Sequence, residues 1–377
     1  MDERSPPRRN VAPSPVTAAV PHRLVSLDAL RGFDMCCILG LTAAIEAVLA
    51  RFLPASPLTA ALRRQFTHVE WAGLRFEDLI FPLFLFISGA ALAISVPRRL
   101  ERDGGGAVVR HLVARALVIF ALGVVYSGGV SRGWEQVRWL GVIQRIGIAS
   151  AVAGLLSIRL GQRGLAIVTV ALLVGYWLAL AFVPVPGHGA GDFAEGRNLA
   201  NYLDSIWLPG RKYDGDHDPE GILSTLPAVG TALLGLLAGQ WLSRDVAAGR
   251  KVGGLLLAGV VLLAAGWVWH PFFPVVKKIW SSSFVLVTAG WSAILLAVFF
   301  WLIDVRGWRR WCEPFVWVGA NPIALYLAAG MGAFRAVNQR LVGPLPPEWA
   351  WVGSITVFVL MLLTARWLYR RGILLRV

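Results

Sequence analysis

Apolar windows of about 17 to 24 residues recur along the chain, with short polar segments between them. A helix needs about 20 apolar residues to cross roughly 30 Å of hydrocarbon, so each window predicts a membrane-spanning helix. Ten spans are expected, near residues 29–49, 79–96, 112–128, 139–158, 164–183, 222–242, 252–269, 284–303, 314–330 and 350–368. The pattern predicts an all-α fold, a polytopic membrane helix bundle.

One expected span, 314–330, contains Asn321-Pro322. Proline supplies no amide hydrogen, so the helix ladder should break there. Breaks of this kind are tolerated in membranes where they are buried in protein or line a cavity.

Composition supports a membrane protein. Of 377 residues, 56% are hydrophobic and only 15% are charged, and the mean hydropathy is +0.63. This is more apolar surface than a soluble core of this size would use. Residues 1–22 are Pro- and Arg-rich without the apolar core of a signal peptide, which predicts a disordered cytoplasmic tail. Residues 23–377 are expected to form one transmembrane domain.

Charge predicts orientation and partners. Basic residues are retained on the cytoplasmic side of membranes, and their distribution over the loops predicts that both termini are cytoplasmic. The net charge of +14 is spread over short loops, without a basic cluster interleaved with aromatics. We therefore expect attraction to anionic membrane lipid and no nucleic-acid partner. An alanine- and arginine-rich composition suggests a bacterial inner membrane.

No metal is expected. Cys36 and Cys37 are adjacent within one span and Cys312 lies in a loop, so they form no framework of thiols. The acidic run 214–221 has alternate carboxylates, but Pro219 stands where a calcium loop needs glycine.

Two carboxylates at the end of the acidic run, Asp218 and Glu220, precede the sixth expected span. One interpretation is that they only cap the helix. The other is that they also face outward toward a cationic or amino-bearing ligand.

The segment before the second span concentrates proton-transfer groups: His68, Glu70, Glu77 and Asp78. Imidazole titrates near neutrality, and a carboxylate can fix its tautomer, so His68 could act as a base or nucleophile. Two interpretations are open, because a histidine beside Trp71 could equally be an amphipathic surface residue.

Charged residues within spans are costly unless they are paired or face water. In the first span Asp28, Arg31 and Asp34 are spaced three apart, on neighbouring positions of one helix face. They could form an internal ion pair that locks the helix. Alternatively, Arg31 and Arg115 of the third span could line a cytoplasmic vestibule for phosphates, which suit the guanidinium fork.

Gln144 and Arg145 lie about 9 Å inside the fourth span. A buried arginine needs a carboxylate partner, and Asp78 is the preferred candidate. Lys278 and Trp280 precede the eighth span, where lysine and tryptophan are ordinary interface anchors, although a ligand contact is also open.

Taken together, several motifs resemble the heparan-α-glucosaminide N-acetyltransferase family, and they occur in the family's order. They are Ser26–Gly32, His68–Leu74, Asp78–Pro82, Gly141–Arg145 and Asp218–Gly221, extended by Lys278-Ile279-Trp280 and Asn321. The family's lysosomal members have an asparagine near the outer end of the first span, where this chain has Thr42.

The resemblance implies a transmembrane acyltransferase. It would take an acetyl group from cytosolic acetyl-CoA and deliver it to an amino sugar or glycan on the opposite face. His68 matches the family's active-site histidine. The implied site comprises His68, Asp78 and Arg145 for catalysis, Arg31, Arg115 and Gln144 for the donor, and Glu70, Trp71, Asp218, Glu220, Lys278 and Asn321 for the acceptor. Arg145 or Gln144 could stabilise a developing oxyanion.

Two other functions fit the sequence less well. An amino-sugar transporter would need the charged vestibule but not a titrating histidine. A non-catalytic scaffold would have little use for so many ionisable groups within spans. The sequence leaves the oligomeric state open, with a homodimer as one alternative.

Overall fold

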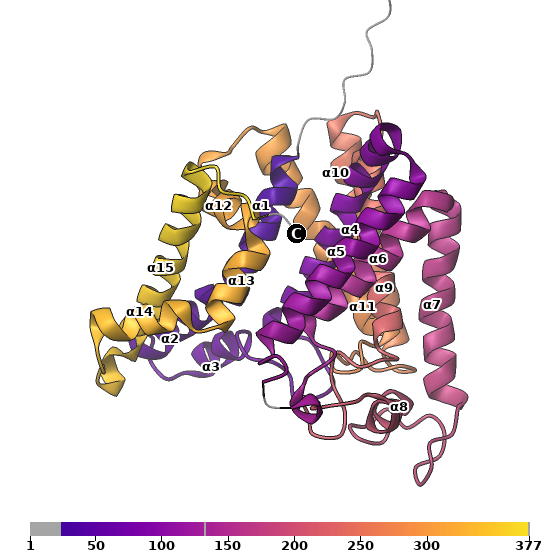
Figure 1. Ribbon diagram of the computed structural model, residues 1–377, viewed down its shortest axis with the longest axis horizontal. Helices are drawn as coiled ribbons and strands as arrows, with labels where there is room; N and C mark the ends of the chain where they lie inside the picture. Colours follow the sequence, from indigo (N-terminus) through magenta and orange to yellow (C-terminus); the bar gives the residue numbers. More distant parts are fainter. Residues whose placement is uncertain (1–23, 132, 376–377) are drawn as a thin grey trace, which may run out of the picture.

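The computed structural model describes residues 24–131 and 133–375, so the predicted tail, residues 1–22, lies outside the described part. Within that part the fold is helical, with isolated β-bridges between loops and no strand (Figure 1). The α-helices are α1 Val25–Cys36, α2 Thr42–Phe52, α3 Pro57–Arg64, α4 Phe76–Asp103, α5 Gly105–Tyr126, α6 Val142–Arg159, α7 Gln162–Phe182, α8 Leu199–Trp207, α9 Thr225–Leu242, α10 Ala248–Trp269, α11 Ser282–Phe299, α12 Glu313–Ala320, α13 Pro322–Gly330, α14 Ala333–Val342 and α15 Ala350–Arg370.

The described residues contain nine helices long and apolar enough to span a membrane, which confirms a polytopic bundle. The first, Val25–Phe52, joins α1 and α2 through a π-helical turn, Cys37–Leu41. Gly40 in that turn has φ of 123°, a value that glycine adopts without a Cβ clash.

The ninth expected span, near 314–330, is not one continuous helix. It consists of α12 and α13, of eight and nine residues, which meet at Asn321. The break occurs at the predicted proline, because the ring of Pro322 cannot donate to the ladder.

The helices form two groups (Figure 1). Helices α4 to α11 make the larger group, in which α4 packs along α9 and α10 packs along α11. The smaller group contains α1, α2 and α12 to α15, with α1 packed against α12 and also touching α4 and α11. Loops and the short helices α3 and α8 gather at one end of the bundle.

Small residues allow the closest helix contact of the larger group. A Cβ placed on Gly89 of α4 would lie 1.9 Å from the carbonyl oxygen of Ala232 on α9. A Cβ on Gly235 of α9 would lie 1.9 Å from the carbonyl oxygen of Phe86 on α4. Because lipid provides little hydrophobic drive between helices, such close backbone packing is a main source of their association.

Helix α4 runs from one end of the bundle to the other (Figure 1). Asp78 lies in its first turn and Arg98 twenty residues later, which at 1.5 Å per residue separates them by about 30 Å, the thickness of the hydrocarbon core. We call the end of the bundle that contains Asp78 the histidine end and the end that contains Arg98 the arginine end. The first described helix begins and α15 finishes at the arginine end (Figure 1).

Candidate active site

His68 and Asp78 form a hydrogen-bonded pair at the histidine end. The Nδ1 atom of His68 lies 2.8 Å from Oδ1 of Asp78. The Asp78 carboxylate is fully buried, whereas 58% of the His68 side chain is exposed. Asp78 Oδ2 accepts the backbone N–H groups of Val69 at 3.3 Å and Arg75 at 3.1 Å. These bonds fix the carboxylate and let it orient the imidazole, whereas the sequence left open which of the nearby carboxylates, Glu70, Glu77 or Asp78, would contact His68.

Lys277 completes this group, and the sequence analysis missed it. Its Nζ lies 3.0 Å from His68 Nδ1, 3.4 Å from His68 Nε2 and 3.4 Å from Asp78 Oδ1. Burial lowers the pKa of Lys277, while the carboxylates of Asp78 and Glu220 oppose that shift. The signal for it in the sequence is the Lys277-Lys278 pair before Trp280, of which only Lys278 was predicted as a ligand contact.

Backbone contacts bring the two loops of this site together. Gly73 donates its N–H to the carbonyl of Val275 at 2.8 Å, and Ala72 forms an antiparallel bridge with Val276. The φ of Gly73 is 122°, in the region that favours glycine. Trp71 donates from its indole nitrogen to the carbonyl of Phe193 at 3.1 Å, so its polar atom is used to hold the loops.

Arg145 does not pair with Asp78, and this prediction was wrong. The guanidinium is buried, donates from Nη2 to Ser224 Oγ at 2.5 Å and to the Gly221 carbonyl at 3.3 Å, and lies 5.0 Å from the ring centroid of Trp280. Hydroxyl, carbonyl and aromatic face replace the expected carboxylate as its close contacts.

Asp218 and Glu220 neither cap a helix nor face outward. Both are buried and bind Arg138, whose Nη2 lies 2.7 Å from Asp218 Oδ1 and 2.6 Å from Glu220 Oε2. Helix α9 begins only at Thr225. Burial raises the pKa of Glu220, although the neighbouring arginines Arg138 and Arg145 act against it. The wrong expectation arose because Arg138, eighty residues earlier, was not seen as the partner.

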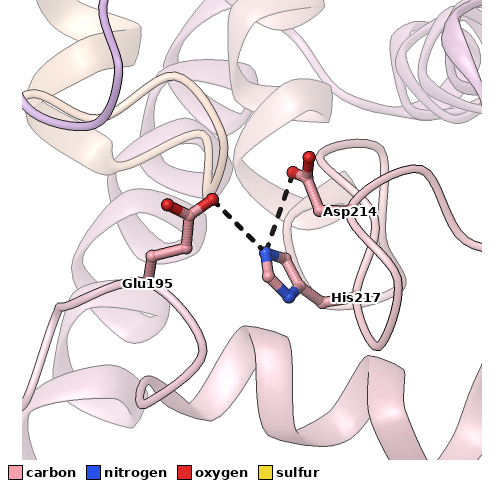
Figure 2. A group of neighbouring side chains, drawn as sticks. All are labelled: Glu195, Asp214 and His217. Atoms are coloured by element: carbon pink, nitrogen blue, oxygen red, sulfur yellow. Dashed lines mark ion pairs between the residues drawn. The ribbon is translucent and has the colours of Figure 1, made fainter.

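Lys278 contacts a polar cluster formed by Glu195, Asp214 and His217, and Figure 2 shows these three residues. Its Nζ contacts Glu195 Oε1 and lies 3.2 Å from Asp214 Oδ2. His217 Nε2 is 3.7 Å from an oxygen of each of the same two carboxylates, as Figure 2 shows.

The three residues drawn in Figure 2 have the donor atoms of a metal site within 4.8 Å of one another. Lys278, however, places an ammonium on both carboxylates, and they raise its pKa although burial acts to lower it. The ammonium of Lys278 therefore balances the two carboxylates in the place where a metal ion would otherwise do so.

Three other predicted contacts have different roles. Asn321 is buried, donates from Nδ2 to the carbonyl of Ile373 at 2.9 Å and accepts from the N–H of Leu375 at 2.7 Å. Its amide thus binds the carboxyl-terminal segment. Gln144 is also buried and donates to the carbonyl of Arg138 at 3.3 Å. Glu70 is exposed on the loop that carries His68.

The arginine end contains a basic cavity of about 380 Å³ between α1 and α4. Arg31 and Asp28 lie in its wall with Nη1 and Oδ1 3.4 Å apart, and Arg98, Arg99 and Arg102 of α4 add three further guanidinium groups. The three arginines of α4 were not predicted.

The other two charged residues predicted for this region occupy different environments. Arg115 lies near enough to Arg31 and Arg99 to sense their charges. Asp34 is fully buried, and among the described residues neither of its oxygens has a hydrogen-bond partner.

Between the two ends lies a small apolar cavity of about 30 Å³, lined by residues including Met35, Phe81 and Tyr326. Such a volume holds about one water molecule. Tyr326 also lines a larger cavity of about 600 Å³ toward the histidine end, together with Gly40 and Ala43, which flank Thr42. The 30 Å³ cavity, called the constriction below, shares Ile38 and Tyr326 with the 600 Å³ cavity and no wall residue with the basic cavity at the arginine end.

The part of the chain that contains His68, Asp78 and Arg145 is similar to a known protein family. The family described as "Heparan-alpha-glucosaminide N-acetyltransferase, catalytic" matches residues 23–262, more than half of the chain. The human heparan-alpha-glucosaminide N-acetyltransferase is 28% identical over 323 residues, which cover 70% of this chain and 48% of the human protein. The mouse protein of the same name is 28% identical over 325 residues, with the same coverage.

The chain spans about half the length of the curated relatives it matches. The family match includes His68, Asp78, Arg145 and the carboxylates that bind Arg138, whereas Lys277 lies beyond it.

Proposed function

Because the chain belongs to the heparan-alpha-glucosaminide N-acetyltransferase family, we propose that it transfers an acetyl group from acetyl-CoA to an amino sugar or envelope glycan. The observation that carries this proposal is the exposed His68 held by a buried Asp78, 2.8 Å away, beside Lys277. An imidazole oriented by a carboxylate and open to solvent is the standard arrangement for general-base or nucleophilic catalysis.

Asp78 determines which nitrogen of His68 reacts. With the Nδ1 proton donated to the carboxylate, the lone pair of Nε2 is available. Nε2 either takes a proton from the acceptor amine as it attacks the thioester carbonyl, or attacks that carbonyl itself and forms a transient acetyl-imidazole. In both routes a C–N bond to the acceptor forms, the C–S bond breaks, and the thiolate of CoA takes the proton.

Lys277 supplies positive charge where the reaction creates negative charge. Its ammonium lies 3.4 Å from Nε2 of His68, close to where a tetrahedral intermediate would carry its oxyanion. A partly buried cation is more effective there than one in water, because the lower dielectric strengthens its field. Arg145, predicted for this role, is engaged with Ser224 and the Trp280 ring instead.

The basic cavity at the arginine end suits the phosphates of coenzyme A. Arg31, Arg98 and Arg99 offer forked donors, which match phosphate oxygens, while Arg102 in the same wall binds Asp103 through two hydrogen bonds. Under the predicted orientation this end is cytoplasmic, in a bacterial inner membrane. The pantetheine arm would then pass between α1 and α4 toward His68, and the constriction beside Phe81 and Tyr326 must widen to admit it.

Replacement of His68 tests the proposed function. His68→Ala removes the proposed base or nucleophile, so acetyl-CoA turnover by the purified protein should fall by about a thousandfold or more. His188→Ala is the matched control, because His188 is an exposed loop histidine, and it should retain full turnover.

Equal acetyl-CoA turnover by the His68→Ala variant and the unmodified protein would contradict the proposal. Uptake of an amino sugar into vesicles by that variant, without acetylation, would favour the transporter alternative.

A further inference from the structure

A second polar cavity lies at the histidine end, outside the His68 group. Its volume is about 340 Å³, and its walls combine three cations, two aromatic rings and a hydroxyl, from Tyr126, Ser127, Arg138, Arg211, Lys212 and Tyr213. None of these six residues carries a carboxylate. A cavity of this size and composition is typical of a small-molecule site.

The charge in this cavity is positive. Arg138 is balanced by Asp218 and Glu220. By contrast, Arg211 and Lys212 have no ion pair with any carboxylate in the described part of the chain. The nearest acids in sequence are engaged elsewhere, because Asp214 contacts Lys278 and Asp216 contacts His217.

Backbone contacts position these cations. Arg211 donates its N–H to the Val137 carbonyl at 3.1 Å, and Gly210 bridges with Arg138 in antiparallel fashion. Gly210 has φ of 75°, and a Cβ there would lie 2.1 Å from the carbonyl oxygen of Val137, so this close approach needs glycine.

Tyr213 is fixed by two further contacts. Its N–H donates to Asp218 Oδ2 at 3.0 Å. Its ring lies 5.0 Å from the guanidinium carbon of Arg138. The wall of the cavity is therefore tied to the buried ion pairs behind it.

The cavity adjoins the proposed reaction site by two routes. Tyr126 lines both this cavity and the 600 Å³ cavity, and its ring stacks on Tyr326 at a centroid distance of 4.8 Å. Glu220, bonded to Arg138, also lies near enough to Lys277 to act on its charge. The cavity is therefore linked to the His68 group through the charged side chains of Arg138, Glu220 and Lys277.

We propose that this cavity binds an anionic group of the acceptor, so that the acceptor is an amino sugar that carries a phosphate, carboxylate or sulfate. The inference rests on the proposed acetyl transfer and specifies its substrate class. Arg211 and Lys212 bind the anion by charge-assisted hydrogen bonds, and the tyrosine rings cover the apolar face of the sugar. Neither residue touches the group that is acetylated.

The test compares glucosamine with glucosamine 6-phosphate as acceptors. The unmodified protein should use the phosphate with the lower KM. In the double variant Arg211→Ser, Lys212→Ser the KM for glucosamine 6-phosphate should rise about 100-fold, because two charged hydrogen bonds are lost, while the KM for glucosamine changes by less than about twofold. Arg197→Ser is the control, since Arg197 pairs with Asp192 on the exposed surface of the same end.

A binding measurement separates this inference from the proposed function. Calorimetric titration of glucosamine 6-phosphate into detergent-solubilised protein should show binding that the double variant weakens by a similar factor, whether or not turnover occurs. Turnover without preference for the phosphate, and with no effect of the double variant, would overturn the inference and leave the proposed function standing. Binding of glucosamine 6-phosphate that depends on Arg211 and Lys212, without any turnover, would support the anion site and contradict the proposed acetyl transfer.

An anionic lipid headgroup offers the same chemistry from a second source. Nanodiscs with phosphatidylglycerol in place of phosphatidylcholine should leave the affinity for glucosamine 6-phosphate nearly unchanged. If instead phosphatidylglycerol binding depended on Arg211 and Lys212 while the sugar phosphate did not bind, the cavity would be a lipid site, and the proposal would be wrong.

Discussion

At the scale of single residues, the partly buried ammonium of Lys277 places a positive charge beside His68 and Asp78. Sequence reasoning identified His68 and Asp78 because both lie in one short segment, ten residues apart. It could not choose between Lys277 and Lys278, since adjacent residues of an irregular loop carry no periodicity. Their directions are set by tertiary contacts, the bridge at Val276 and a positive φ of 50° at Trp280. The contacts of Arg145 with Ser224 and Gly221 could not be predicted either, because these residues lie more than seventy positions away in the sequence.

The lowered pKa of Lys277 predicts an alkaline limit to activity. Burial favours the neutral amine, so Lys277 loses its proton at a lower pH than the ordinary lysine value of 10.5. As pH rises through that lowered pKa, the charge beside His68 disappears and acetyl-CoA turnover should fall. Lys277→Met should remove this limb of the pH profile and reduce kcat by about 100-fold at neutral pH.

Lys277→Arg keeps the charge at all accessible pH values, so it should move the alkaline limb upward. Lys278→Met is the neighbouring control and should leave the profile unchanged, because Lys278 pairs with Glu195 and Asp214. A profile that responds to Lys278 and not to Lys277 would show that the wrong lysine has been placed in the site.

At the scale of helices, the bundle depends on close approach between α4 and α9. Asp78 and the three arginines are placed by α4, so a shift of this helix would move both ends of the site. The hydrophobic pattern predicted the spans well, because length and apolar content alone determine which segments cross a bilayer. It did not predict that α12 and α13 would be separate, short helices, since Asn321 also depends on a contact with residues 373 and 375.

Gly235→Ala tests the contact between α4 and α9. The added methyl group would meet the Phe86 carbonyl oxygen at 1.9 Å, so the helices must separate. We expect a loss of about 1–3 kcal/mol of unfolding free energy, the usual cost of overpacking, measured by thermal unfolding in detergent. Gly175→Ala in α7 is the control, because a Cβ there meets nothing within 4 Å. Equal melting temperatures for the two variants would show that the α4–α9 contact is not tight.

At the scale of the whole molecule, acetyl transfer across the membrane would require two sites at opposite ends of the bundle to act together. The basic cavity at the arginine end and the His68 group at the other are about 30 Å apart along α4, and the 30 Å³ constriction lies between them. The sequence predicted the two ends from charges within and beside the spans. It could not predict the 30 Å³ cavity between them, because the size of a cavity depends on how the side chains of α1, α4 and α13 pack around it.

Transfer across a sealed membrane tests the central claim most directly. Proteoliposomes are prepared with glucosamine 6-phosphate inside, and acetyl-CoA labelled in the acetyl group is added outside only. Neither compound crosses the bilayer, so protein molecules with the arginine end outward should place labelled acetyl-glucosamine 6-phosphate in the lumen, and His68→Ala vesicles should contain none. Product that forms only when donor and acceptor are on the same side of the membrane would contradict the account.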